Sequence, residues 1–422
     1  MKLSRRTFLK ASGSSAALLA TVGCDQLPRE MRVLYASPKS SGPFQPPTAA
    51  EIDPVAHVLN RLTFGPRPGD YERVRKLASM PEDAAVAFIE QQLNPERIND
   101  AEADFAVRRF ETLNEPLGEL FEYQDDLLQK ELMRATLTRA ILSERQLFEV
   151  MVQFWSDHFN IDPSKGDCKW LKVADDREVI RKHALGRFPD MLRASALSPA
   201  MLWYLDGRVN RRENMKEKPN ENYARELLEL HTLGVHGGYT QKDVMEVARC
   251  LSGWTVRSRN QKPYFEIGKV EFKLPRHDCE TKEVLGQRIP SLPGNLPTAE
   301  REQLGRQELD RILGIVTRYP ATAKHISTKL CQRFIADEPP AAAVDVVAAT
   351  FTRTEGDIRA TLRALFATDD FRRHRGNKLK RPFNFIVSAL RATGADTNAG
   401  LEIIDYLQRM GHAPFNYPTP DG

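Results

Sequence analysis

Apolar residues recur at helical spacing through nearly the whole chain after residue 54, and this periodicity constrains the fold more than any other feature. One stripe is continuous through Phe148, Met151, Val152, Trp155 and Phe159. Such spacing at i, i+3, i+4 and i+7 is typical of a helix that buries one face. With 422 residues, 41% of them apolar, the chain also has enough apolar side chains for a sizeable core.

Proline and capping residues indicate where several helices begin. Four prolines are predicted to lie in first turns, at Pro189, Pro199, Pro320 and Pro382. The pattern Thr240-x-x-Asp243 resembles a capping box, and Gly253 is expected to end the helix that follows it. No internal repeat and no strong domain boundary is visible. We therefore expect a mainly α fold, a multi-helix globular domain over residues 54–422.

Residues 264–290 are the exception to the helical pattern. Their apolar and polar residues alternate, as in a strand with one buried face. We expect one short β-hairpin in this range.

The N-terminus has the features of an export signal. Arg5 and Arg6 precede a weakly apolar stretch, residues 11–22, which is too short to span a bilayer. Residues 1–23 therefore resemble a twin-arginine signal peptide; an ordinary basic amphipathic start is the alternative. The first 23 residues hold four basic and no acidic residues, so the remaining chain is formally neutral. Because the chain after residue 23 has no net charge, nucleic acid is not expected as a partner.

Cys24 follows this stretch in the sequence Thr21-Val22-Gly23-Cys24, which resembles a lipoprotein cleavage box. We predict that Cys24 carries a lipid anchor; simple cleavage nearby is the alternative. The Pro-rich residues 24–53 are then a tether. Together these features predict an exported protein, anchored to the membrane on the periplasmic or extracellular face.

The four remaining cysteines contain no C-x-x-C pair, so a structural zinc or redox motif has no support. Cys250 and Cys331 lie on helical stripes and are expected to be core thiols. Cys168 and Cys279 lie in polar, loop-like sequence. A disulfide between these two is an alternative in an exported protein.

Several segments together resemble a bacterial exported family known as domain of unknown function 1800. They comprise residues 57–65, 154–159, 220–234, 237–240, 277–286, 380–383 and 418–422. The resemblance covers about residues 54–422, and it implies a mostly helical fold and frequent export but no established activity. The family usually continues past the final Pro-Asp-Gly, so this chain is expected to stop short of the family's usual C-terminus.

The most specific of these segments, residues 220–234, places polar residues on one helical face. At 3.6 residues per turn that face carries Asn222, Arg225, Glu226 and Glu229, with His231 opposite. On one interpretation the face is solvated, and Arg225 pairs with Glu221 and Glu229. On the other it is buried, as the specificity of the motif suggests. The carboxylates would then ligate a hard divalent cation such as Mg²⁺, Mn²⁺ or Ca²⁺, act as acid and base, or join a polar network.

Other candidates lie outside this helix. His158 borders an apolar stripe, which favours a core histidine over a ligand, whereas His277-Asp278 follows the expected strands and suits ligation or proton transfer. His236 lies in a glycine-rich turn that is explained equally by loop geometry and by anion binding. The catalytic candidates are Glu226, Glu229, Arg225 and His277. The candidate metal ligands are Asp206, Glu226, Glu229, His158, His277 and Asp278.

Residues 372–381 form the only basic cluster in the body of the chain. Most such runs are solvated linkers, and a functional one would face anionic lipid or an acidic partner.

Serine hydrolase, zincin, P-loop and Rossmann signatures are absent from the sequence. The sequence thus slightly favours a non-catalytic scaffold or binding module, with an envelope protein or polysaccharide as partner. The alternative is a cation-dependent, hydrolase-like envelope enzyme that uses the carboxylates of the 220–234 helix.

Overall fold

The computed structural model describes residues 47–212 and 217–422. The predicted signal peptide and Cys24 lie outside these residues. Contacts within the chain group residues 48–422 into one compact unit. In the described residues no helix combines the length and the apolar character needed to cross a membrane.

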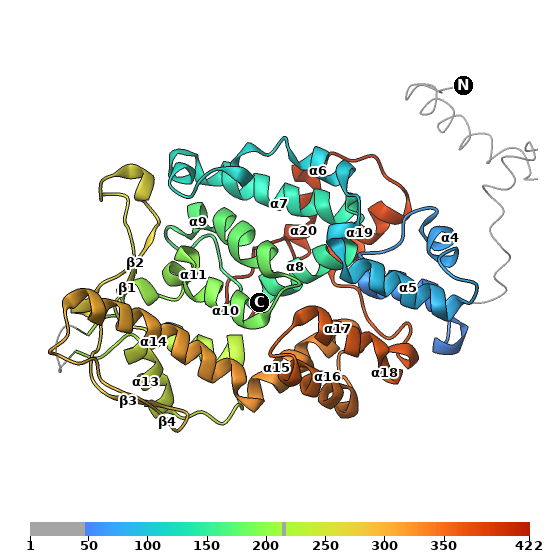
Figure 1. The fold of residues 1–422 in the computed structure, drawn as a ribbon. Coiled ribbons are helices and arrows are strands. Elements are labelled where there is room, and N and C mark those ends of the chain that lie inside the picture. The colour runs from blue at the N-terminus through green and yellow to red at the C-terminus, as the bar shows by residue number, and fades with distance from the viewer. Residues whose placement is uncertain (1–46, 213–216) are drawn as a thin grey trace, which may run out of the picture. The chain divides into compact units, whose positions relative to one another are not determined.

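Helices dominate this unit, as the periodicity predicts (Figure 1). The helices of the first half are α3 (Pro54–Leu62), α4 (Asp70–Arg75), α5 (Pro81–Leu93), α6 (Ala101–Val107), α7 (Asp125–Leu142), α8 (Gln146–His158), α9 (Cys168–Asp175), α10 (Phe188–Ala196) and α11 (Pro199–Tyr204). Those of the second half are α12 (Asn222–Glu226), α13 (Gln241–Cys250), α14 (Thr298–Arg318), α15 (Pro320–Phe334), α16 (Ala341–Arg353), α17 (Ile358–Ala367), α18 (Asp369–Arg373), α19 (Pro382–Ala392) and α20 (Leu401–Arg409).

The predicted helix boundaries are confirmed. All four prolines lie in first turns, those of α10, α11, α15 and α19. At the start of α13, Thr240 and Asp243 form the capping box, in which the Thr240 backbone amide donates to the Asp243 carboxylate at 2.8 Å. The helix ends at Cys250, and Gly253 follows with φ of 89°, a conformation that favours glycine.

The predicted hairpin is formed by strands β3 (Lys282–Val284) and β4 (Gln287–Ile289), which pair antiparallel with Lys282 opposite Ile289. A second antiparallel pair joins β1 (Trp254–Val256) to β2 (Val270–Phe272). Residues 264–266, at the start of the predicted range, form a 3₁₀ turn instead of a strand.

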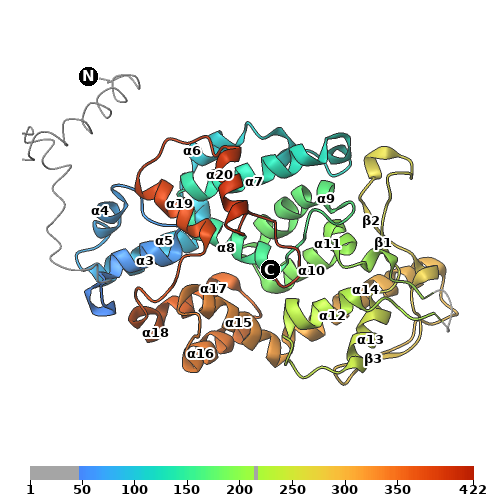
Figure 2. The same ribbon diagram turned by 180° about the vertical axis from the view of Figure 1, so that it is seen from behind.

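The apolar stripe of α8 lies at the centre of the core. Trp155 is fully buried, and its indole nitrogen donates to the Ala184 carbonyl at 3.0 Å. Helices α3, α5 and α7 pack against α8. Farther along the chain, α15, α16 and α17 pack in succession, and α17 contacts α5, so the C-terminal helices return to the N-terminal ones (Figures 1 and 2).

Cysteine placement confirms part of the prediction. Cys250 and Cys331 are buried core thiols. The loop-like context expected for Cys168 is wrong, because this residue is the first of α9 and is fully buried. Cys168 and Cys279 are both free thiols, so the structure does not support the disulfide alternative. Burial raises the pKa of Cys168 to about 12, which makes it unreactive.

Candidate functional site

The segment 220–234 begins as an α-helix and then widens. Residues 222–226 form α12, and a π-helical turn, η8 (Leu227–Thr232), follows without a break. A π-helical turn contains more than 3.6 residues. The side chains after residue 227 therefore point in different directions from those expected for an ideal α-helix. His231 is fully buried, whereas Asn222 is exposed.

The polar face of this helix is only partly covered. Asn222 is exposed, and the side chains of Arg225 and Glu229 are 37% and 22% exposed. Arg225 pairs with Glu221 at 3.2 Å and with Glu229 at 3.3 Å, which are the two pairs expected for a solvated face. The hypothesis that this face is buried in the core is therefore wrong.

Glu226 is the carboxylate of this face for which no ion pair occurs among the described residues. It is partly exposed, and its burial together with the charge of Glu229 raises its pKa. Asp206, the nearest additional candidate, pairs with Lys165 at 3.1 Å and lies 3.5 Å from the Asn222 side-chain amide. The structure thus brings Asp206 to the start of α12, where cationic and amide groups contact it.

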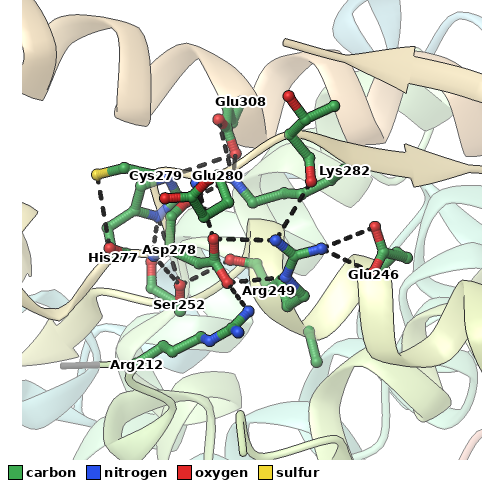
Figure 3. Close-up of polar contacts among 12 residues, drawn as sticks. Arg212, Glu246, Arg249, Ser252, His277, Asp278, Cys279, Glu280, Lys282 and Glu308 are labelled. Atoms are coloured by element: carbon green, nitrogen blue, oxygen red, sulfur yellow. Dashed lines mark hydrogen bonds and ion pairs between the residues drawn. The ribbon is translucent and has the colours of Figure 1, made fainter. Parts of the chain in front are cut away.

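Asp278 lies at the centre of a buried polar network between α13, α14 and β3 (Figure 3). Its Oδ2 accepts from Arg249 Nε at 2.7 Å and also from Arg212. Its Oδ1 accepts from Arg249 Nη2 at 3.2 Å and from the Glu280 backbone amide at 2.9 Å. Both oxygens therefore already accept two hydrogen bonds each, and arginine charge holds the pKa of this carboxyl below its usual value despite burial.

His277 belongs to the same network and is buried with it. Its Nδ1 donates to the Ser252 carbonyl at 2.8 Å, and its Nε2 lies 3.3 Å from Glu308 Oε2. Lys282 Nζ bonds both oxygens of Glu308, at 2.9 and 3.1 Å. Because both ring nitrogens face protein groups, this geometry is that of a network that fixes β3 against α13 and α14.

His158 is a core histidine, as the sequence favours. Its ring lies among Trp155, Phe159 and Phe188, and its Nε2 lies 3.2 Å from the His231 carbonyl. Burial, with the charge of Lys329 as the next cause, keeps the pKa of His158 well below its usual range.

Within residues 47–212 and 217–422, no group of three or more His, Cys, Asp or Glu side chains is arranged to hold a metal ion. The six predicted metal ligands therefore do not converge.

A cleft of about 700 Å³ opens between α3, α8, α15 and the segment that leads into α19. Six cationic side chains line it, against three acidic ones. The cations are Arg61, Lys329, Arg333, Lys378, Lys380 and Arg381, and the acids are Asp157, Asp337 and Asp421. The sequence alone did not predict this site, because the charged residues that line it lie up to 360 positions apart, from Arg61 to Asp421.

Among residues 47–212 and 217–422, two of these cations have an ion-pair partner. Lys378 pairs with Asp337, and Arg381 pairs with Asp157 at 2.9 Å. In the described part of the chain, Arg61, Lys329, Arg333 and Lys380 form no ion pair. The one local signal for the cleft was the basic cluster 372–381, of which three basic residues, Lys378, Lys380 and Arg381, line it.

Comparison with known proteins identifies the family. The model of the family described as "Protein of unknown function (DUF1800)" matches residues 57–422. The chain belongs to this family. Neither the curated proteins nor the solved structures contain a significant match.

Proposed function

We propose that this DUF1800 family member is an exported, membrane-tethered binding protein of the cell envelope, whose ligand or partner occupies the cleft. The proposal rests on a cleft of roughly 700 Å³ in which four of six cations form no ion pair with the residues that the structure describes. Large concave sites with a few convergent polar groups are where proteins bind ligands. Uncompensated charges there cost stability, which a ligand of opposite charge restores.

An enzyme that uses the 220–234 carboxylates is supported less well. Glu229 is paired with Arg225, and the neighbouring Glu226 is partly exposed, near enough to Asp421 for that charge to raise its pKa. Asp278 has both oxygens occupied by arginine and backbone donors. A general acid or base needs an atom free to exchange a proton with a substrate, and of these carboxylates only Glu226 offers one, without a paired acid or base of assigned role.

Export and tethering rest on the sequence. The Arg5-Arg6 pair and Cys24 resemble a twin-arginine signal and a lipidation site, and residues 24–53 are rich in proline. A lipid on Cys24 would hold the cleft within reach of the periplasmic or extracellular surface, where an envelope protein or polysaccharide is available as partner.

The proposal is tested by blocking the cleft. Asn60 is exposed on α3 and lines the cleft, so Asn60→Trp fills its entrance without entering the core. Gln91→Trp, at an exposed position of α5, is the matched control. The full chain is incubated with detergent-extracted cell-wall sacculi and with solubilised envelope proteins. The parent and the control should bind one of these, and Asn60→Trp should lose that binding. Equal binding by both variants, or none by the parent, contradicts the proposal.

A further inference from the structure

We infer that the cleft binds an acidic saccharide, a chain of hydroxyl-bearing sugars that carries carboxylate or phosphate groups, with the anion held by Arg61, Lys329 and Arg333. The inference rests on the proposed binding function and narrows it to one class of ligand. The charge of the cleft, the state of its cations and the chemistry of its uncharged lining each contribute to it.

Arg61 and the Nη2 atom of Arg333 are buried, and among the described residues neither guanidinium forms an ion pair. The charges of Asp337 and Asp157 act on them from farther away and offset only part of the effect of burial. Arg61 is 7% exposed, and its Nη2 donates to the His374 carbonyl at 3.0 Å, a neutral acceptor. Arg333 Nη2 is buried and has no hydrogen-bond partner among the described residues. Buried charged donors are normally paired, because leaving them unpaired costs more than a surface charge does. An anion in the cleft supplies the missing acceptor.

The pKa values of Arg61, Arg333 and Lys329 agree with the burial of these cations. Burial lowers the pKa of Arg61 and of Arg333 to about 10, and it also lowers the pKa of Lys329. All three remain cationic at neutral pH, yet each has lost part of its hydration. A bound carboxylate or phosphate would replace that hydration with charge-assisted hydrogen bonds.

Side-chain amides indicate that the ligand also carries hydroxyl groups. Gln153, Gln332 and Asn384 line the cleft, and their amides form no hydrogen bond with the described residues. An amide both donates and accepts, as a sugar hydroxyl does. A protein partner is favoured less, because the centre of a protein interface is typically apolar and depleted of charge.

Three probes separate the parts of this inference. Polygalacturonate carries carboxylates on sugars, dextran carries sugars without charge, and tripolyphosphate carries charge without sugars. Titration calorimetry of the full chain in neutral detergent at low salt should show polygalacturonate binding at least about tenfold more tightly than either of the others. Equal binding of dextran overturns the role of charge, and equal binding of tripolyphosphate overturns the role of the sugar. No binding of polygalacturonate overturns the inference outright.

Charge removal tests the assigned residues. Lys329→Met and Arg333→Met should each weaken polygalacturonate binding about tenfold, since each removes a charge-assisted contact. Arg311→Met, an exposed position on α14 outside the cleft, is the control and should change binding less than about twofold. Neither cleft variant breaks an ion pair, so both should melt at or above the temperature of the parent. Unchanged affinity in both, or an equal loss in the control, overturns the assignment.

The failure of this inference is distinguishable from failure of the proposed function. If dextran binds and Asn60→Trp abolishes that binding, the cleft is a binding site but its ligand is neutral. If phosphatidylglycerol added to the micelles displaces polygalacturonate, the cleft accepts a lipid headgroup, and the saccharide assignment is wrong. If Asn60→Trp binds every probe as the parent does, the cleft is not the site, and both proposals fail.

Discussion

Arg249 binds Asp278 through two hydrogen bonds, from Nε to Oδ2 at 2.7 Å and from Nη2 to Oδ1 at 3.2 Å. Arg249 lies on α13 and Asp278 precedes β3, so this pair joins the hairpin to the helical body. A bidentate arginine–carboxylate pair has fixed geometry as well as charge. The position of His277 and of β3 therefore depends on a contact between two residues that are 29 positions apart in the chain.

Removing the Asp278 carboxylate should destabilise the protein strongly. Asp278→Ala removes the carboxylate that Arg249 and Arg212 share, and because Arg249 keeps its pair with Glu246 at 2.8 Å, we expect a loss of about 1.5–3 kcal/mol from the unmade charge-assisted hydrogen bonds. Denaturant unfolding monitored by circular dichroism measures the change. Glu283→Ala nearby is the control, since it removes an exposed pair with Lys242 and should cost less than about 1 kcal/mol. Equal losses in the two variants would contradict the role assigned to Asp278.

The 222–229 face should tolerate substitution. Because Arg225 and Glu229 are partly exposed and paired at i, i+4, we expect Glu229→Ala to lower the free energy of unfolding by less than about 1 kcal/mol. Thermal or denaturant melts of the variant beside the parent check this. A loss of several kcal/mol would show that the face is buried in the native protein.

Buried neutral histidines should make the protein less stable in acid. Burial lowers the pKa of His57 to about 4 and that of His231 to about 3, whereas an unfolded histidine titrates near 6.5. Below pH 6.5 the unfolded chain binds more protons, so the free energy of unfolding falls as the pH falls, by up to about 1.4 kcal/mol per pH unit for each histidine. This loss continues to about pH 4 for His57 and is absent above pH 7.

His57→Gln provides the check on that pH dependence. The His57 Nε2 donates to the Phe371 carbonyl at 2.8 Å, and a glutamine amide retains a donor at a similar reach. Urea unfolding between pH 7 and 4 should show a shallower decline for the variant. If the free energy of unfolding falls equally steeply with pH in parent and variant, His57 does not contribute to the loss of stability in acid.

The sequence predicted local structure well and long-range assembly poorly. Pro320 and the Thr240–Asp243 box marked helix starts, because caps and first-turn prolines act within a few residues. The turn η8 was not predicted, because no residue type marks a π turn.

The cleft is the clearest example of a feature that the sequence alone could not predict. Arg61 and Arg333 meet across 272 positions, and neither carries a local signature of binding. The basic run did contribute Lys378, Lys380 and Arg381, but composition alone could not show which of its residues turn inward. The sequence offered His277 and Asp278 as candidates for ligation or proton transfer, and only the hydrogen-bond partners of each atom place them in a buried polar network.

Export and anchoring should depend on separate residues of the leader. Replacing Arg5 and Arg6 by lysine should leave the precursor in the cytoplasm, because the twin-arginine signal is read through the arginines themselves. Cys24→Ala should release the processed protein from membranes, since the lipid is attached through that thiol. Cell fractionation with immunoblotting reports both. Unchanged distribution of both variants would contradict the predicted export route and anchor.

The central claim is that binding resides in the cleft and not on the carboxylate face, and one comparison tests it most directly. Full-length Asn60→Trp and the double variant Glu226→Gln/Glu229→Gln are measured side by side for binding to detergent-extracted sacculi and solubilised envelope proteins. If the ligand binds in the cleft, the cleft variant should lose at least about tenfold in affinity and the carboxylate variant should change less than about twofold. Full binding by Asn60→Trp together with loss by Glu226→Gln/Glu229→Gln would contradict it.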